Sequence, residues 1–256
     1  MCLITISYKQ HPAYPLIIVQ NRDESYSRES LPIHIWDDFP EIIAGRDTLH
    51  GGTWAGMTKT GRIASLTNRP FETHSAGENA LSRGKLVKDF LTGQESAEDF
   101  LRSLKAERNN YDSYQLMFGT VNDLHVYSNA SDHHRILEPG LHSLSNTDDD
   151  ISAHKVDRSL DLVGAYLKDY PEPKLDDLLL IFRDAEQADD LRRIPEQVST
   201  ELAYTHSSIF IKGEQFGTVN TTALSVRSDK TVKMKEYRYD QQTQIEATEI
   251  TFQLSK

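Results

Sequence analysis

Apolar residues at the start of the chain form two short runs, and both predict β-strands. The runs cover 3–8 and 16–19, are rich in β-branched residues, and are separated by a loop that contains Pro12 and Pro15. This pattern is typical of two antiparallel strands joined by a longer hairpin loop. Antiparallel pairing about the centre of that loop places Cys2 opposite Asn21 or Arg22, depending on the register.

Similar patterns predict strands along the rest of the chain. A second hairpin joins 51–57 to 62–68 through a turn at 59–61, which places Gly51 or Gly52 opposite Asn68. The segment 31–36 is expected to be irregular with one short strand. The other predicted strands are 41–47, 114–120, 123–128, 135–137, 140–145, 205–212, 215–225, 231–239 and 246–254, with a tight turn at 212–214.

Apolar positions at helical spacing predict helices in two blocks. The first block contains 82–91, with Ser82 as N-cap, and 96–107, where Ser96 caps the helix together with Asp99. The second block contains 152–168 and 175–183 and is followed by a charged stretch, 184–193, read as a solvated helix or loop.

The order of these elements predicts the fold class. Hairpins, two blocks of helices and further hairpins fit two antiparallel sheets stacked face to face with helices outside. This is an α+β fold, a four-layer αββα sandwich. The sequence has no linker and no internal repeat, so one domain is expected over residues 1–256.

The charged and apolar composition limits the kinds of molecule that the protein is expected to bind. The 256 residues include 28 basic and 39 acidic side chains, a formal net charge of −11, which argues against nucleic acid and against an anionic membrane surface. The longest apolar runs are too short to cross a bilayer, so no membrane insertion is expected. The N-terminus lacks the features of a secretory signal, which predicts a cytoplasmic protein. The oligomeric state stays open.

The only cysteine is Cys2. A single cysteine excludes an internal disulfide and any multi-cysteine zinc site. The initiator methionine is generally removed before a small residue, which would leave Cys2 with a free α-amine. This amine, with an ordinary pKa of about 7.7–8.0, could accept the proton of its own thiol, which is a known way to activate a nucleophile. The alternative is that Cys2 is an inert, buried small hydrophobic residue.

Charged and amide side chains are predicted to lie near Cys2. Arg22 beside the thiol would lower the thiol pKa, and Asp23 could accept a hydrogen bond from the terminal ammonium. Asn68 and Asn146, each at the end of a predicted strand, are candidate oxyanion donors. Strand-terminal polar residues are also common turn formers, which is the alternative for Asn146 and for residues 21–24.

Two other features have structural and functional interpretations. Gly51 and Gly52 permit close approach of another backbone or of a ligand, and the alternative is that they only form a turn, as most such pairs do. His133 and His134 suggest an exposed turn more strongly than a metal site, and no metal is predicted.

Several of these motifs together resemble the NRDE family, the transport and Golgi organisation protein 2-like proteins, over nearly the whole chain. The motifs that carry the resemblance are Met1-Cys2, the tetrad 21–24, the block 51–56, the strand end 66–68, and the segments 82–84, 144–146 and 207–210.

This family is similar in turn to the N-terminal nucleophile hydrolases of the choloylglycine hydrolase and penicillin V acylase type. The resemblance implies catalytic roles for five residues: Cys2, Arg22, Asp23, Asn68 and Asn146. Four residues are assigned to substrate binding: Asn21, Gly51, Gly52 and Trp54. Arg227 is the candidate for a further arginine that this branch uses near its C-terminus.

The predicted function is a cysteine N-terminal nucleophile hydrolase that acts on a non-peptide amide or thioester acyl substrate and needs no cofactor. The alternative is a non-catalytic carrier of haem or of another hydrophobic ligand in metabolic homeostasis, since haem trafficking and acyl-lipid handling are both associated with the family. In the alternative, Cys2 or a histidine would ligate the haem iron. Both hypotheses predict a small-molecule acyl or hydrophobic ligand as partner.

Overall fold

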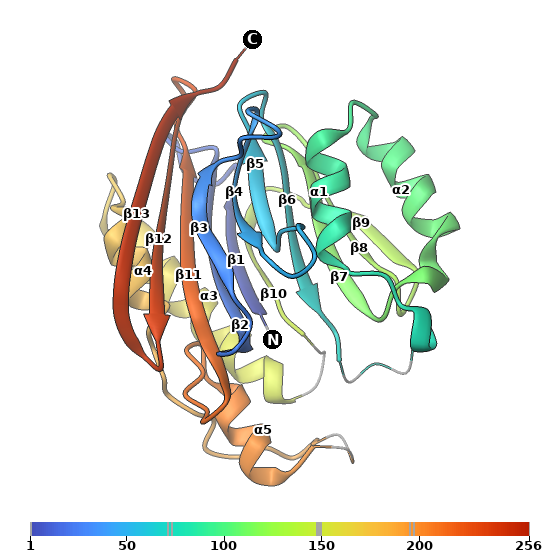
Figure 1. Ribbon diagram of the computed structural model, residues 1–256. Coiled ribbons are helices and arrows are strands. Elements are labelled where there is room, and N and C mark those ends of the chain that lie inside the picture. Colours follow the sequence, from blue (N-terminus) through green and yellow to red (C-terminus); the bar gives the residue numbers. More distant parts are fainter. Residues whose placement is uncertain are drawn as a thin grey trace. The chain divides into compact units, whose positions relative to one another are not determined.

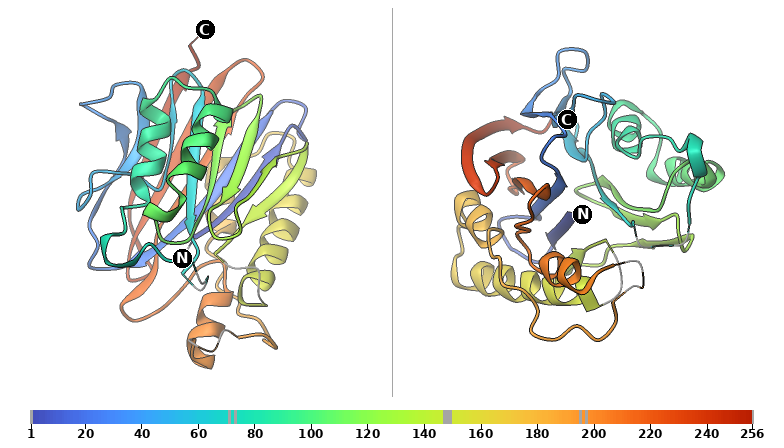
Figure 2. Two further views of the ribbon diagram at one scale, coloured as in Figure 1. Left: turned by 90° about the vertical axis from the view of Figure 1, so that its right-hand side faces the viewer. Right: turned by 60° about the horizontal axis from the view of Figure 1, so that its bottom comes forward.

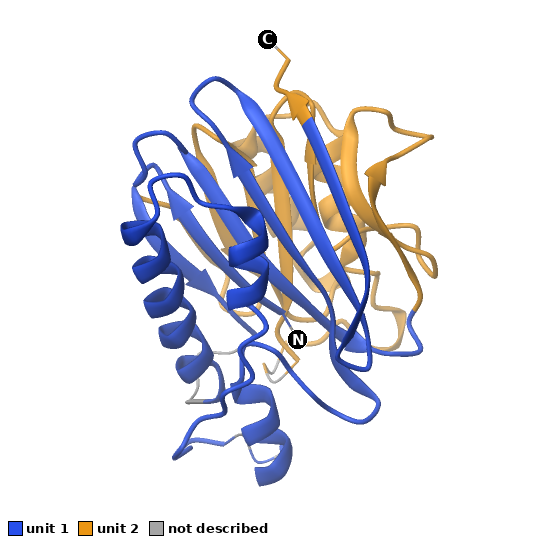
Figure 3. Cartoon of the chain, turned by 90° about the vertical axis from the view of Figure 1, so that its left-hand side faces the viewer, with its two compact units in different colours: residues 1–28, 139–251 blue, residues 29–138, 252–256 orange. Residues whose placement is uncertain are grey.

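The computed structural model describes residues 2–70, 72, 74–146, 150–194, 196 and 198–255. The chain divides into two compact units, one formed by residues 1–28 and 139–251 and the other by residues 29–138 and 252–256 (Figure 3). The backbone therefore leaves the first unit after the opening hairpin and returns to it later. The expectation of one domain over 1–256 stays a prediction.

The first unit contains a six-stranded antiparallel sheet in the order β10-β1-β2-β11-β12-β13 (Figure 1). Its strands are β1 (Cys2–Tyr8), β2 (Leu16–Ser25), β10 (Gly140–Leu144), β11 (Phe216–Val226), β12 (Thr231–Asp240) and β13 (Thr243–Gln253). The helices of this unit are α3 (Asp150–Asp169), α4 (Leu175–Ile181) and α5 (Thr200–Ser207).

The register of the opening hairpin is fixed along its whole length. Tyr8 pairs with Leu16 at the loop end, and Cys2 pairs with Arg22 at the open end. Strand β2 continues through the tetrad 21–24 to Ser25, because β11 pairs with it on the other side. The tetrad is therefore central sheet and not the polar turn that was the alternative interpretation.

One face of this sheet is covered by α3 and α4. Leu3, Ile17 and Val19 of the sheet pack with Val163 of α3 and with Leu178 of α4 in a single buried cluster. These three sheet residues share one face because side chains alternate along a strand. Cys2 and Arg22, at the alternate positions, belong to the opposite face.

The second unit contains a seven-stranded antiparallel sheet in the order β3-β4-β5-β6-β7-β8-β9. Its strands are β3 (Ser30–Ile35), β4 (Ile42–Asp47), β5 (Ala55–Thr58), β6 (Arg62–Asn68), β7 (Tyr114–Thr120), β8 (Leu124–Ser128) and β9 (His133–Ile136). Its helical segments are η1 (Gly77–Asn79), α1 (Gly84–Thr92), α2 (Ala97–Ala106) and η2 (Arg108–Asn110).

The helices α1 and α2 lie against one face of this second sheet (Figure 2), and aromatic side chains hold them there. The rings of Phe90 in α1, Phe100 in α2 and Phe118 in β7 lie with their centroids 5.0 to 5.4 Å apart. Tilted and edge-to-face contacts at this separation add to the free energy gained by burying the rings.

The observed elements confirm most of the predicted ones and correct two of them. Ser96 caps α2, as predicted, by accepting a hydrogen bond from the Asp99 backbone. Ser82 is not a cap, because α1 begins at Gly84 after Arg83, and the cap position makes no side-chain hydrogen bond.

The predicted strand 205–212 is wrong, since the chain there is helical up to Ser207. The Ser199 side chain caps this helix, α5, by accepting a hydrogen bond from the Leu202 backbone. The apolar residues 209–211 that suggested a strand are buried without forming a named strand. Their burial explains the apolar pattern that local sequence alone assigned to a sheet.

Among the helices of the described residues, none combines the length and the apolar character needed to cross a membrane.

Two leucines of α4 provide a matched test of the first unit's core. Leu178 is fully buried, whereas Leu180 in the same helix is 54% exposed. We expect Leu178→Ala to lower the free energy of unfolding by about 2–5 kcal/mol, because it leaves a cavity. Leu180→Ala should change it by less than about 0.5 kcal/mol. Urea unfolding of both variants measures the difference, and equal effects would contradict the assigned packing.

Candidate active site

The backbone nitrogen of Cys2 is held by a side chain from another strand end. It donates a hydrogen bond to Oδ1 of Asn146, with an N···O distance of 2.9 Å. Asn146 follows β10, which pairs with β1 so that Ile4 faces Leu144. Both Cys2 and Asn146 are buried. The structure therefore brings together two of the predicted site residues that lie 144 positions apart.

Arg22 is the cross-strand neighbour of Cys2 and is also buried. Burial raises the pKa of the Cys2 thiol, and the charge of Asp23 adds to this rise. The Asp23 backbone and the Arg22 guanidinium act in the opposite direction. Arg22 thus lowers the thiol pKa as expected, but the net shift is upward because desolvation of the thiolate is the larger effect.

The Asp23 carboxylate lies among buried polar groups. Its Oδ1 accepts a hydrogen bond of 2.7 Å from the Thr218 hydroxyl, which is on β11. Burial raises the pKa of Asp23, while the positive charge of Lys155 and the Thr218 hydrogen bond oppose the rise. Asp23 pairs across the sheet with Thr218 and follows Arg22 on the same strand, so its side chain belongs to the helix-covered face.

Three residues of this cluster were missed by sequence reasoning: Thr218, Lys155 and His206. Lys155 is 1% exposed and belongs to α3. On the same side of that helix, Ser152 accepts a hydrogen bond from Ser145 and Ser159 accepts one from Thr5. A lysine within a helical pattern looks like an ordinary surface residue, and the packing of α3 against the sheet and α5 accompanies its burial.

Asn21 is separated from Cys2 and Arg22 by the sheet itself. Its Nδ2 donates hydrogen bonds to the carbonyl oxygens of Phe182 (3.0 Å) and Ile209 (2.7 Å). Its Oδ1 accepts a hydrogen bond from the Thr221 hydroxyl. These bonds attach β2 to the segments that follow α4 and α5. The structure thus does not bring Asn21 onto the face that carries Cys2.

Asn68, Gly51, Gly52 and Trp54 belong to the second unit. Asn68 ends β6 and pairs with Tyr114. A Cβ atom on Gly52 would lie 2.6 Å from the carbonyl oxygen at the start of α1, so this glycine permits the close backbone approach that was predicted. Their predicted place beside Cys2 and the ligand stays a prediction.

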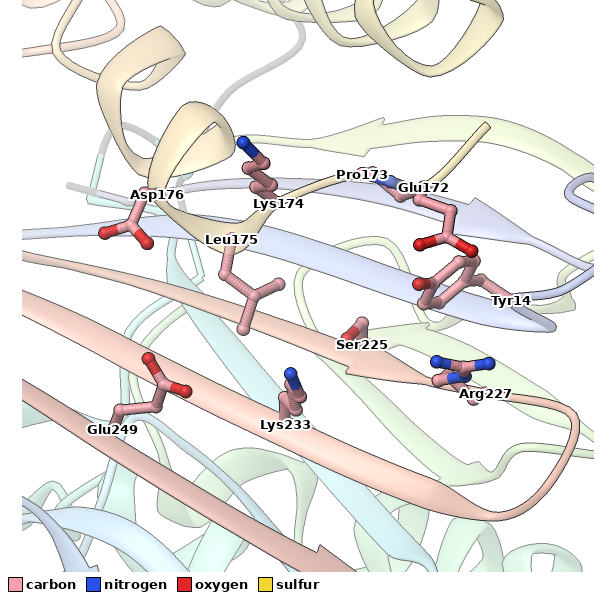
Figure 4. Close-up of a pocket in the computed structure, with 10 residues that line it drawn as sticks. All are labelled: Tyr14, Glu172, Pro173, Lys174, Leu175, Asp176, Ser225, Arg227, Lys233 and Glu249. Carbon is pink, nitrogen blue, oxygen red and sulfur yellow. The ribbon is translucent and has the colours of Figure 1, made fainter. Parts of the chain in front are cut away.

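The predicted further arginine, Arg227, follows the end of β11 that pairs with Leu16. This is the loop end of the opening hairpin and not the end that carries Cys2. Arg227 lies over the ring of Tyr14 and lines a pocket of about 320 Å³ together with acidic and basic side chains of the first unit (Figure 4). Strand direction therefore argues against Arg227 as a partner of Cys2.

The exposed turn predicted at 133–134 is wrong, because both histidines belong to β9. Nε2 of His134 lies 3.0 Å from Nδ1 of the buried His125, and Nε2 of His125 lies 3.4 Å from Asp123. Glu98, Asp123 and His125 could each offer one ligand atom to a cation. Exposed carboxylates commonly gather without an ion, and the expectation that the protein holds no metal stays a prediction.

Two solved structures are similar to this chain in fold. The C2A mutant of conjugated bile acid hydrolase from Clostridium perfringens matches with a TM-score of 0.57 and 11% identity, over 98% of this chain and 92% of that chain. The Caenorhabditis elegans ortholog of N-acylethanolamine-hydrolyzing acid amidase matches with a TM-score of 0.50 and 10% identity, over 87% of this chain and 92% of that chain. The chain thus has the N-terminal nucleophile hydrolase fold, which confirms the predicted α+β class.

The family is shown by sequence. The family model of Transport and Golgi organisation 2 matches residues 1–241, and the chain belongs to this family. The human Transport and Golgi organization protein 2 homolog is 33% identical over 159 residues, and the bovine homolog is 31% identical over 159 residues. Each match covers 57% of this chain and 57% of the relative.

The shifted thiol pKa predicts how fast Cys2 reacts at different pH values. Because burial favours the neutral thiol, we expect the rate of alkylation by iodoacetamide to rise with a midpoint above the ordinary thiol value of about 8.5. The same protein unfolded in urea is the control and should show the ordinary midpoint. Rates measured by mass spectrometry between pH 6 and 10 test this, and a lower midpoint in the folded protein would contradict it.

The lowered pKa of the buried His206 predicts that the stability of the fold depends on pH. Burial, followed by the charge of Lys155, lowers the pKa of His206 to about 3. Below about pH 6.5 the His206 side chain of the unfolded chain binds a proton, whereas that of the folded chain does not. The contribution of the neutral His206 to the free energy of unfolding is therefore complete above that pH and is lost as the pH falls. From pH 6.5 to 4.5 the unfolding free energy should fall about 1.4 kcal/mol per pH unit more steeply than in His206→Asn. Parallel curves in urea titrations would contradict this assignment.

Proposed function

We propose that this protein is a cysteine N-terminal nucleophile hydrolase that cleaves a non-peptide amide or thioester. The hydrogen bond between the Cys2 nitrogen and Asn146 is the observation that carries the proposal. In a chain without Met1 that nitrogen is the α-amine, which would act as the base. The fold shared with a bile acid hydrolase and with an N-acylethanolamine-hydrolyzing amidase supports the same class of chemistry.

The first half-reaction transfers the acyl group to sulfur. The α-amine accepts the proton of the Cys2 thiol, and the sulfur attacks the substrate carbonyl carbon to form a tetrahedral intermediate. The bond to the leaving nitrogen or sulfur then breaks, and the ammonium returns the proton to that atom. A thioester at Cys2 remains, and the amine is neutral again.

The second half-reaction releases the acid. The neutral α-amine accepts a proton from water, and the oxygen attacks the thioester carbonyl. Collapse of this intermediate breaks the carbon–sulfur bond, and the sulfur recovers the proton from the ammonium. The products are the free acid and the starting enzyme. Because the pKa of the buried thiol is raised, a base within the same residue is what makes attack effective near neutral pH.

The other site residues are proposed to orient the Cys2 nitrogen and to stabilise the charges that form during the reaction. Oδ1 of Asn146 fixes the Cys2 nitrogen, and Nδ2 of the same carboxamide is a suitable donor for the developing oxyanion. Asn68 is proposed as the second donor. Arg22 stabilises the thiolate, and the Asp23 carboxylate stabilises the ammonium that forms during proton transfer.

The sequence assigned four residues to substrate binding: Asn21, Gly51, Gly52 and Trp54. Gly51, Gly52 and Trp54 are proposed to contact the substrate. The hydrogen bonds of Asn21 favour an indirect role, in which it fixes the strand that carries Arg22.

Intact-mass analysis tests the proposal directly. We expect the purified protein to lack Met1 and to gain one acyl group when mixed with an excess of an activated thioester. Because Cys2 is the only cysteine, Cys2→Ala should remove every thiol-borne adduct and abolish turnover. A variant that retains an N-terminal extension before Cys2 is the matched control, since it keeps the thiol but lacks the free α-amine, and its acylation should be at least about 100-fold slower.

A non-catalytic carrier would give a different result. Saturable binding of haem or of an acyl ligand that survives Cys2→Ala, together with no acyl adduct and no released acid in the wild type, would overturn the hydrolase proposal.

A further inference from the structure

A row of side chains crosses the first unit's sheet from the proposed nucleophile. Cys2 of β1 pairs with Arg22 of β2, Arg22 pairs with Asn220 of β11, and Asn220 pairs with Arg238 of β12. Directly paired residues project from the same face of a sheet. Since neighbouring strands lie about 4.8 Å apart, Asn220 is two strands and about 10 Å from Cys2, measured along the row.

Asn220 lies in the middle of this row, between two arginines. It is 1% exposed, and neither its Oδ1 nor its Nδ2 has a hydrogen-bond partner among the described residues. A buried amide without a partner costs about 1–3 kcal/mol, so proteins rarely keep one unless a ligand or water satisfies it. Asn220 thus offers one acceptor and two donors on the face that carries the Cys2 thiol.

A β-bulge places Asn220 on this face. The register of β11 against β2 shifts between Thr218 and Asn220. Thr218 bonds to Asp23 on the helix-covered face, whereas Asn220 pairs with Arg22 and belongs to the opposite face. In a regular strand, Thr218 and Asn220 would share one face because they lie two positions apart, and the bulge at Val219 separates them. Bulges often re-aim a side chain beside an active site.

The charges on either side of Asn220 already face carboxylates. Arg22 lies 4.0 Å from Glu24, and Arg238 lies 3.9 Å from Glu236 and 3.5 Å from Glu246. Because opposite charges accompany both guanidinium groups, the row does not require an anionic ligand. The polar group that Asn220 would recognise is therefore neutral and able to donate and accept hydrogen bonds.

The two sides of β1 suggest which part of the substrate reaches Asn220. The Cys2 nitrogen, which would protonate the leaving group, is held by Asn146 next to β10. Asn220 lies in the other direction, because the strand order is β10-β1-β2-β11. The leaving group would then depart on the β10 side, and the acyl chain would extend over β2 toward β11.

We propose that Asn220 is a specificity-determining residue that binds an amide in the acyl chain of the substrate. This inference rests on the proposed function and names the class of acyl group, one that carries a secondary amide about four to six bonds from the cleaved carbonyl, as the separation along the row requires. Sequence reasoning gave no signal for it, since Asn220 lies inside a strand pattern and only the bulge turns it to the face of Cys2.

Paired esters that differ in one amide test the proposal. The 4-nitrophenyl esters of N-acetyl-4-aminobutyrate, N-acetyl-5-aminopentanoate and N-acetyl-6-aminohexanoate are each compared with the straight-chain ester of equal backbone length. We expect at least one amide ester to have a kcat/KM about 10-fold or more above its partner. In Asn220→Leu this ratio should fall to about one. Ser225→Ala, a change on the same strand and on the opposite face, should keep the ratio.

A binding experiment separates this proposal from the proposed function. The methyl esters of the three N-acetyl amino acids and of the matching straight-chain acids are titrated into Cys2→Ala, which cannot form an adduct, and the midpoint of thermal unfolding is followed. A saturable rise with an amide ligand that disappears in Cys2→Ala/Asn220→Leu supports the role of Asn220, even if the wild type turns over none of the esters.

The proposal is overturned if no amide ester or methyl ester is preferred over its partner, or if the preference survives the loss of the Asn220 amide. Circular dichroism checks that Asn220→Leu is folded. If that variant does not fold, Asn220→Ser replaces it in both experiments, and an unchanged preference in this shorter variant overturns the proposal as well.

Discussion

The pairing register of β1 and β2 is the constraint on which the rest of the structure depends. It places Cys2 opposite Arg22 and, through β11, sets the position of Asn220. A slip by one residue would move every side chain of the strand to the other face of the sheet. The register is well specified, because one face must contribute Leu3, Ile17 and Val19 to the core beneath α3 and α4.

The sheet separates two groups of polar residues. Cys2, Arg22 and Asn220 share one face, whereas Asn21 and Asp23 belong to the helix-covered face. Neighbouring residues of the tetrad thus have different structural roles. Asn21 makes three hydrogen bonds that fix neighbouring segments, and Asp23 lies in a buried cluster with Thr218. Burying so many polar groups is costly unless each is satisfied, which explains the dense hydrogen bonding on this face.

Burial of Cys2 has two opposite effects on the reactivity of its thiol. It raises the pKa of the Cys2 thiol, so Arg22 alone does not produce a thiolate near neutral pH. It also removes competing water from the groups around the sulfur, which strengthens each electrostatic contact. In the proposed mechanism, a proton acceptor within the same residue would resolve this conflict, because the proton would move over a very short distance and no second charged side chain would have to be buried.

The sequence by itself determined the alternation of strands and helices, the antiparallel opening hairpin and the fold class, because these follow from local apolar periods and turn residues. It also nominated Cys2, Arg22, Asp23 and Asn146. Arg22 pairs with Cys2 and Asn146 bonds to the Cys2 nitrogen, whereas Asp23 influences the thiol pKa although its side chain belongs to the other face. Only the tertiary structure decided that Asn21 turns away, that Lys155 and His206 are buried, and that 200–207 is a helix. Likewise, only the bulge in β11 set the direction of Asn220. These outcomes depend on which face each strand presents and on what packs over it, and contacts between residues far apart in the chain leave no local periodic signal.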